Sequence, residues 1–253
     1  MSESILGEAL EGRPEPHFIS TKLGYLPAGF DYTYDMCMRC FEGSLKRLRR
    51  DKIDVLFIHD PDRMGGGSYH PVFGKGMALE ACQKLKEQGV IKAIGIGSLW
   101  LDYQAYCIDS GELDVILTFN RYGLIWRDAQ FQTFPFCRRR DTGIVQGTPF
   151  HQGVLAERHD EWITNPPEWM TVSEHEAFRK LYAIQDRYGL SLPEMALRFI
   201  LGNPQISVTI PGAADLTQLD ANLAAAEKGP LPEPVQAEVE TLGILHSDPK
   251  RYI

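Results

Sequence analysis

Residues 53–62 read IDVLFIHDPD, an apolar run that ends in a histidine and in two aspartates around a proline. The apolar part is rich in β-branched residues and lacks strict alternation, which is typical of a parallel strand covered on both faces by helices. Runs of the same kind occur at 17–22, 92–97, 114–119, 143–147 and 206–210. We therefore predict six strands of one parallel sheet.

Amphipathic segments separate these runs. In 35–50 the residues Met38, Phe41, Leu45 and Leu48 fall at helical spacing. A second predicted helix, 77–89, ends at Gly89, which suits a helix C-terminal cap. The other predicted helices are 100–110, 126–140, 174–188, 193–202 and 216–227.

The repeated strand–helix units run on without a clear linker, so we expect one α/β domain over residues 1–253, either a barrel or a doubly wound sheet. No Gly-x-Gly-x-x-Gly follows the first strand, which removes the main support for a dinucleotide-binding doubly wound domain. This absence favours a barrel but leaves the choice between the two open. Such a barrel normally has eight strands, and only six are predicted here.

Composition excludes several classes of protein. The 253 residues are 43% hydrophobic and 24% charged, with a net charge of −8, which argues against nucleic acid or an anionic membrane as a partner. Five cysteines argue against a disulfide scaffold and favour a reducing compartment. No apolar run reaches the ~18 residues that span a bilayer, and the first residues are acidic rather than basic, so we expect a cytoplasmic protein.

Several ordered motifs carry a family resemblance. They are Ile19–Gly24 (ISTKLG), Phe30–Asp35 (FDYTYD), Ser44–Leu48 (SLKRL), Ile53–Asp62, Gln88–Ser98 (QGVIKAIGIGS), Phe119–Tyr122 (FNRY) and Ile210–Ala213 (IPGA) followed by Gln218 and Asn222. In this order they resemble the aldo-keto reductases over nearly the whole chain. The nearest branch is that of the D-threo-aldose (L-fucose, galactose) and pyridoxal dehydrogenases.

The resemblance implies an eight-stranded (β/α) barrel and an NAD(P)-dependent oxidoreductase that acts on the carbonyl or alcohol of a small sugar or aldehyde. The family's catalytic set is Asp, Tyr, Lys and His, of which Lys22 and His59 match the last two. In the family the Asp and Tyr precede a stretch that corresponds to residues 1–3 here. We therefore expect about six βα units, with the N-terminal units missing, and poor carbonyl reduction by this chain alone.

The catalytic chemistry explains these residue types. Carbonyl reduction needs a proton donor and groups that stabilise charge on the carbonyl oxygen; in the family a Lys lowers the pKa of the Tyr, and the His orients the carbonyl. Lys22 and His59 each end a strand, so both are expected at one mouth of the barrel, with Ser98 and Asn120 near them. Tyr25, Tyr32 and Tyr34 are either substitute acids or loop aromatics. Asp60 and Asp62 are either acid–base groups or turn residues.

The resemblance also implies a cofactor site. Ser98 and Asn120 end strands where the family holds the nicotinamide amide. The loop at Gly212 precedes a helix N-terminus, which attracts phosphate, and the family places Gln218 and Asn222 at the adenosine end.

Two features bear on how this cofactor site is read. Asp215 with Gln218 also fits an ordinary N-cap and capping box. No Lys or Arg lies between Gly212 and Asn222, so NAD is favoured over NADP.

The pair Cys37-x-x-Cys40 lacks a second pair or a nearby His, so we expect no metal site and a buried Cys37. An alternative function uses Lys22 and His59 without a cofactor, in a lyase or isomerase, or retains the barrel only as a binding or regulatory protein. An open barrel exposes two strand edges, so we expect a homo-oligomer that covers them. A small-molecule substrate is the other expected partner.

Overall fold

The computed structural model describes residues 2–13, 17–26, 29–63, 72–243 and 246. The chain divides into two compact units. Unit 1 comprises Met1–Leu117 and Arg140–Thr142, and unit 2 comprises Thr118–Arg139 and Gly143–Ile253. Each unit is described by itself below, and a single domain over 1–253 stays a prediction.

The sheet of unit 1 contains three parallel strands that pair in chain order: β1 (Ser20–Leu23), β4 (Ile53–His59) and β5 (Ile91–Ser98). β6 (Val115–Phe119) runs across the boundary between the units. A short antiparallel hairpin, β2 (Tyr25–Leu26) and β3 (Gly29–Phe30), follows β1. The sequence did not predict this hairpin, because each of its strands is only two residues long.

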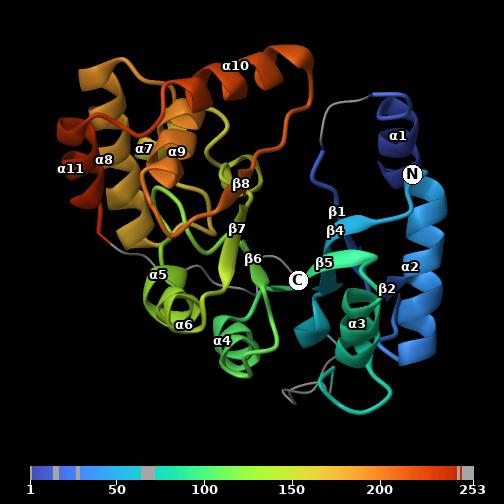
Figure 1. The fold of residues 1–253 in the computed structure, drawn as a ribbon. Helices are drawn as coiled ribbons and strands as arrows, with labels where there is room; N and C mark the ends of the chain where they lie inside the picture. The colour runs from blue at the N-terminus through green and yellow to red at the C-terminus, as the bar shows by residue number, and fades with distance from the viewer. Residues whose placement is uncertain (1, 14–16, 27–28, 64–71, 244–245, 247–253) are drawn as a thin grey trace. The chain divides into compact units, whose positions relative to one another are not determined.

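The helices of unit 1 are α1 (Ser2–Ala9), α2 (Tyr34–Leu48), α3 (Ala78–Glu87), α4 (Leu101–Asp109) and the 3-10 turn η1 (Pro61–Arg63). α1 was not predicted, and it lies along α2 (Figure 1). The two helices approach closely at Gly7, where an added Cβ would lie 2.4 Å from the carbonyl oxygen of Arg47. A residue that lowers helix propensity is therefore required here by packing.

The apolar stripe of α2 is close to the predicted one. Cys37, Phe41, Ser44 and Leu48 are buried, and Cys37 is fully buried as expected for a structural cysteine. At the end of α3, Gly89 has φ +68, and the amide of the next residue, Val90, donates to the Leu85 carbonyl. This left-handed residue ends the helix as predicted.

Unit 2 contains two parallel paired strands, β7 (Gly143–Gly147) and β8 (Val208–Ile210). Its helices are α5 (Ala129–Gln132), α6 (Phe134–Arg140, whose last residue belongs to unit 1), η2 (His151–Gly153), α7 (Glu161–Thr164), α8 (Val172–Tyr188), α9 (Leu192–Leu201), α10 (Leu216–Glu227) and α11 (Glu233–Glu240). All six predicted strands are thus present, each within two or three residues of its predicted bounds.

The predicted helix 126–140 differs from the structure. Residues 126–128 precede the first helical turn, and the segment then forms α5 and α6, separated at Thr133. Pro135 is the reason, because proline lacks the amide that a continuous helix needs and is tolerated in a first turn. Trp126 is instead buried, where its indole donates to Glu174 at 2.9 Å and stacks on His151 at 3.6 Å.

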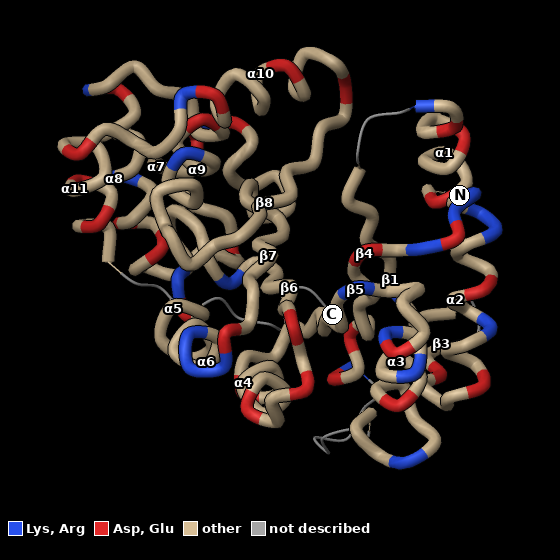
Figure 2. Tube along the Cα trace, viewed as in Figure 1, with Lys and Arg blue, Asp and Glu red and all other residues tan. Residues whose placement is uncertain are grey.

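Lys and Arg residues are interspersed with Asp and Glu residues along the chain, although α10 and α11 carry only acidic ones (Figure 2). The run Arg138–Arg140 on α6 is an exception, but Arg140 is bound to Asp109 and Arg139 lies over the ring of Phe136. No helix in the described ranges is both long enough and apolar enough to cross a membrane. Within those same ranges no group of three or more His, Cys, Asp or Glu could hold a metal ion.

Candidate functional site

Lys22 and His59 lie on the same face of the unit 1 sheet. Lys22 is in register with Phe57, and His59 follows Phe57 by two residues, so alternation places all three side chains on one face. On the next strand, Gly95 is in register with Phe57 and Gly97 with His59. An added Cβ at Gly95 would lie 2.4 Å from the Phe57 ring, so glycine is needed for this ring to lie flat on β5. At Gly97, which is in register with His59, the nearest described atom that an added Cβ would meet is Leu117 Cβ, at 4.0 Å.

The imidazole of His59 is held neutral. Burial, and after it the positive charges of Lys22 and Arg63, lower its pKa to about 4. The imidazole therefore carries one N–H and one lone pair at neutral pH. The positive charge of Lys22 thus acts on the His59 imidazole, which lies on the same face of the sheet.

The three tyrosines of the loop after Lys22 differ in their surroundings. Tyr32 is buried, and its hydroxyl donates to the backbone carbonyl of His59 at 2.5 Å. Burial also raises the pKa of Tyr32 far above its ordinary value, which makes this phenol a poor acid. The exposed Tyr25 ring meets the His59 ring edge-on at 5.8 Å, whereas Tyr34 is the first residue of α2.

Asp60 directly follows the end of β4. Its backbone has φ +45, and its amide donates to the Gly97 carbonyl at 2.8 Å. Carboxylate Oδ2 lies 3.7 Å from His59 Nε2 and 3.7 Å from Arg63 Nη1. Burial and repulsion by Asp62 raise the pKa of Asp60 to about 6, although Arg63 and Lys22 act in the opposite direction.

Asp62 links the same loop to the end of β5. Its Oδ2 accepts hydrogen bonds from Ser98 Oγ at 2.8 Å, from the Leu99 amide at 2.9 Å and from the Trp100 amide at 3.0 Å. Trp100 is the N-cap residue of α4 and Leu99 precedes it, so Asp62 holds the backbone that leads into this helix from another segment. These bonds join distant residues and are neither a local turn contact nor an acid–base role.

Ser98 is buried beside this carboxylate. Alternation along β5 places its side chain on the face opposite Gly97, and its hydroxyl hydrogen is directed to Asp62. Ser98 thus lies at the expected strand end, next to the strand of His59, with only lone pairs to offer a ligand.

Asn120 belongs to unit 2 and ends β6. It is buried with φ +56, and within the described part of the chain neither its side-chain oxygen nor its side-chain nitrogen has a hydrogen-bond partner. Its backbone amide donates to Thr148 Oγ1 at 3.0 Å. A buried amide without partners is costly, because both polar atoms have lost their water. Such a group fits a site that a ligand completes.

The other predicted cofactor residues form the entrance to α10. Asp215 caps the helix by accepting from the Gln218 amide at 2.8 Å, and Gln218 Oε1 accepts from the Ala214 amide at 2.9 Å. The buried Asn222 donates from Nδ2 to the Gly212 carbonyl at 3.2 Å. The N-cap interpretation is therefore correct, whereas the capping box is not formed, because Gln218 accepts from the Ala214 amide rather than from that of Asp215. These bonds also hold the Gly212 loop against the helix.

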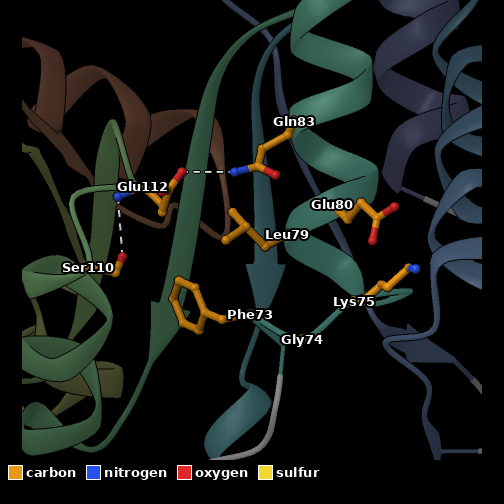
Figure 3. Close-up of a pocket in the computed structure, with 8 residues that line it drawn as sticks. All are labelled: Phe73, Gly74, Lys75, Leu79, Glu80, Gln83, Ser110 and Glu112. Atoms are coloured by element: carbon orange, nitrogen blue, oxygen red, sulfur yellow. Dashed lines mark hydrogen bonds between the residues drawn. The ribbon is translucent and has the colours of Figure 1, made fainter.

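A pocket of about 480 Å³ opens on unit 1 between α3 and the loop after α4 (Figure 3). Phe73 and Leu79 line it together with Glu112, which accepts a hydrogen bond from Gln83 at 2.8 Å. None of the predicted site residues lines this pocket, so it is separate from the chemistry described above.

The sequence left the roles of Asp60 and Asp62 open. Asp62 and Ser98 are 36 positions apart in the sequence, and no local pattern connects them. The sequence alone therefore gave no sign that they are hydrogen-bonded. Pairing of β4 with β5 brings these residues together, and this pairing follows only once strand order is known.

Comparison with known proteins agrees with this arrangement of strands. The aldo/keto reductase family model matches residues 1–244. L-galactose dehydrogenase of Arabidopsis thaliana is 29% identical over 96% of this chain and 72% of its own length. D-threo-aldose 1-dehydrogenase of a Pseudomonas species is 30% identical over 88% of this chain and 74% of its own length.

Among solved structures, an aldo-keto reductase from Bacillus halodurans in its holo form superposes with a TM-score of 0.74 at 23% identity, over 96% of this chain and 78% of that one. This likeness supports the barrel type of fold. The family model matches the sequence itself over residues 1–244. We therefore conclude that this chain belongs to the aldo/keto reductase family, whose members are oxidoreductases.

Proposed function

We propose that this chain is an NAD-linked oxidoreductase acting on the carbonyl or alcohol of a small sugar or aldehyde. The observation that carries the proposal is the shared placement of Lys22 and His59 on one sheet face, with Gly97 in register with His59 on the next strand. Because it is a glycine, Gly97 adds no side chain to this face next to the imidazole. The names of the two relatives given above, an L-galactose and a D-threo-aldose dehydrogenase, favour sugars as the substrate class.

In this proposal His59 orients the substrate carbonyl. A neutral imidazole donates one hydrogen bond to the carbonyl oxygen, and its low pKa keeps it neutral over the physiological range. Lys22 is a cation near the same point, and it stabilises negative charge that develops on that oxygen. Both residues are candidates for catalytic roles.

A nicotinamide cofactor would supply or accept the hydride at the substrate carbon. Asn120 fits its carboxamide, because the buried side-chain amide offers a donor nitrogen and an acceptor oxygen that have no partner among the described residues. Ser98 of unit 1 would offer a ligand only acceptor lone pairs, since its own hydrogen goes to Asp62. The Gly212 loop with Gln218 and Asn222 would hold the adenosine end, close to a helix N-terminus.

We propose NAD rather than NADP as the cofactor. The segment from Gly212 to Asn222 contains no Lys or Arg and two acidic residues, Asp215 and Asp220. A 2′-phosphate bound there would lack a cation and would face negative charge.

We also propose a single barrel domain in a cytoplasmic protein, where its five unpaired cysteines would stay reduced. A second copy of the chain would cover the exposed strand edges. β1 and β8 stand at the two ends of the strand order, and apolar side chains are exposed beside them: Phe18 before β1, and Val208 and Ile210 on β8. Light scattering tests this; a monodisperse monomer would rule out the oligomer.

Binding of NADH tests the cofactor proposal directly. We expect quenching of tryptophan fluorescence by NADH at lower concentrations than by NADPH. Asn120→Ala should weaken NADH binding by roughly 5- to 30-fold, as expected for a lost amide pair. The matched control is Asn165→Ala, an exposed asparagine of the same unit. Equal binding by Asn120→Ala and the control would contradict the assignment of Asn120.

A further inference from the structure

The loop after β4 carries a carboxylate that the proposed function does not use. Asp60 is fixed from both sides: its amide is bonded to β5 at Gly97, and the next residues form η1. Its left-handed φ of +45 is a conformation that aspartate tolerates better than most residues. The backbone therefore holds the carboxylate beside the His59 ring rather than letting it turn to solvent, and three-quarters of its side chain is covered.

Oδ2 of Asp60 is 3.7 Å from Nε2 of His59. At this separation a negative charge attracts an N–H and repels a nitrogen lone pair, so it favours the neutral tautomer with its hydrogen on Nε2. The ring is also restrained by the edge-on contact with Tyr25, and the His59 carbonyl is held by the Tyr32 hydroxyl. Backbone and ring are thus fixed, and the remaining freedom is the position of one hydrogen.

We propose that Asp60 is a positioning residue of the Lys22–His59 site, whose carboxylate keeps the hydrogen of His59 on Nε2 and so makes this nitrogen the hydrogen-bond donor. The inference rests on the proposed function only in naming the group that receives this bond, the substrate oxygen.

The charge of Asp60 is balanced by groups from every element around it. Lys22 on β1 and Arg63 on η1 attract it, whereas Asp62 repels it. His59 is neutral above about pH 4, and the Tyr32 phenol stays protonated. With burial, these groups leave the pKa of Asp60 at about 6. Above this pH the Asp60 carboxylate is charged and favours the His59 tautomer with its hydrogen on Nε2. Below this pH the carboxyl is protonated and no longer favours that tautomer, while His59 is still neutral.

The test is nitrogen NMR of the His59 ring between pH 5 and 8, with the His59→Gln variant to identify its signals. In the unmodified protein we expect a predominant Nε2–H tautomer at the upper end and a change in the ring shifts centred near pH 6. Asp60→Asn should abolish this step. Asp51→Asn is the matched control, since exposed Asp51 precedes β4 at the opposite end of the strand, and it should keep the step.

Asp60→Gly is a second variant that removes the carboxylate where φ is already suited to glycine, so the fold should persist. A step near pH 6 that survives in both Asp60 variants, or a wild-type ring with its hydrogen on Nδ1, would overturn the proposal. The readout needs neither cofactor nor substrate. Failure to bind NADH would contradict the proposed function and leave the NMR result to decide on Asp60 alone.

Discussion

Replacing Asp62 by alanine tests the link between the two strand ends that build the site. One carboxylate oxygen accepts three hydrogen bonds, two of them from the amides at the start of α4. Loss of a helix N-cap costs about 0.5–2 kcal/mol, and hydrogen bonds to a charged group contribute about 1.5–3 kcal/mol each without adding fully. Ser98 recovers part of its loss, since its hydroxyl also reaches the Trp100 carbonyl at 3.2 Å.

We therefore expect Asp62→Ala to lower the free energy of unfolding by roughly 2–4 kcal/mol. Asp62→Asn keeps one acceptor oxygen and loses the charge, so its cost should be about half as large. Urea denaturation followed by circular dichroism measures both. Asp51→Asn serves as the exposed control and should stay within about 0.5 kcal/mol of the unmodified protein. An Asp62→Ala protein as stable as this control would refute the role of these hydrogen bonds.

Three further changes give separate outcomes. Lys22→Met should raise the pKa of His59, because it removes a positive charge that lowers this pKa. A histidine NMR titration measures the change, and an unaltered midpoint would show that Lys22 does not act on His59. Tyr32→Phe should lower the free energy of unfolding by about 1–2 kcal/mol, because the part-buried His59 carbonyl loses its hydrogen-bond donor at 2.5 Å. Urea denaturation measures this, and an unchanged stability would contradict the hydrogen bond. Gly95→Ala should lower the free energy of unfolding by about 1–3 kcal/mol, because the added methyl group would overlap the Phe57 ring on β4. Gly97→Ala should cost less, because its Cβ would lie 4.0 Å from Leu117 Cβ. The reverse order of urea unfolding midpoints would contradict this packing.

The helices and strands that the sequence predicted best are those with a clear periodic pattern of buried residues. β4 and α10 lie at their predicted positions because burial on both faces, or a helical repeat with a cap, leaves a local pattern. α1 was missed because its glycine is required by contact with Arg47 of α2, and a single chain does not show this neighbour. The split between α5 and α6 was visible in Pro135 and was overlooked.

The site follows the same division. Lys22 and His59 were located by motif, and strand register then placed them on one face. The partner of Ser98 was not foreseeable, since Asp62 reaches it only through the pairing of β4 with β5. The shifted pKa of Asp60 depends on burial and on three charged neighbours from two elements, and no local pattern contains that information.

The central claim is that the residues around Lys22 and His59 carry out NAD-linked oxidation of a sugar. The most direct measurement is formation of NADH from NAD by the purified chain with L-galactose as the probe substrate. We expect slow formation of NADH, because only Lys22 and His59 match the family's catalytic set. The reaction should be faster with NAD than with NADP, unchanged in Asp51→Asn and slower by about 10²-fold or more in His59→Gln. Equal rates for His59→Gln and the unmodified protein, or no NADH formed from this or any other small sugar or aldehyde, would contradict the account.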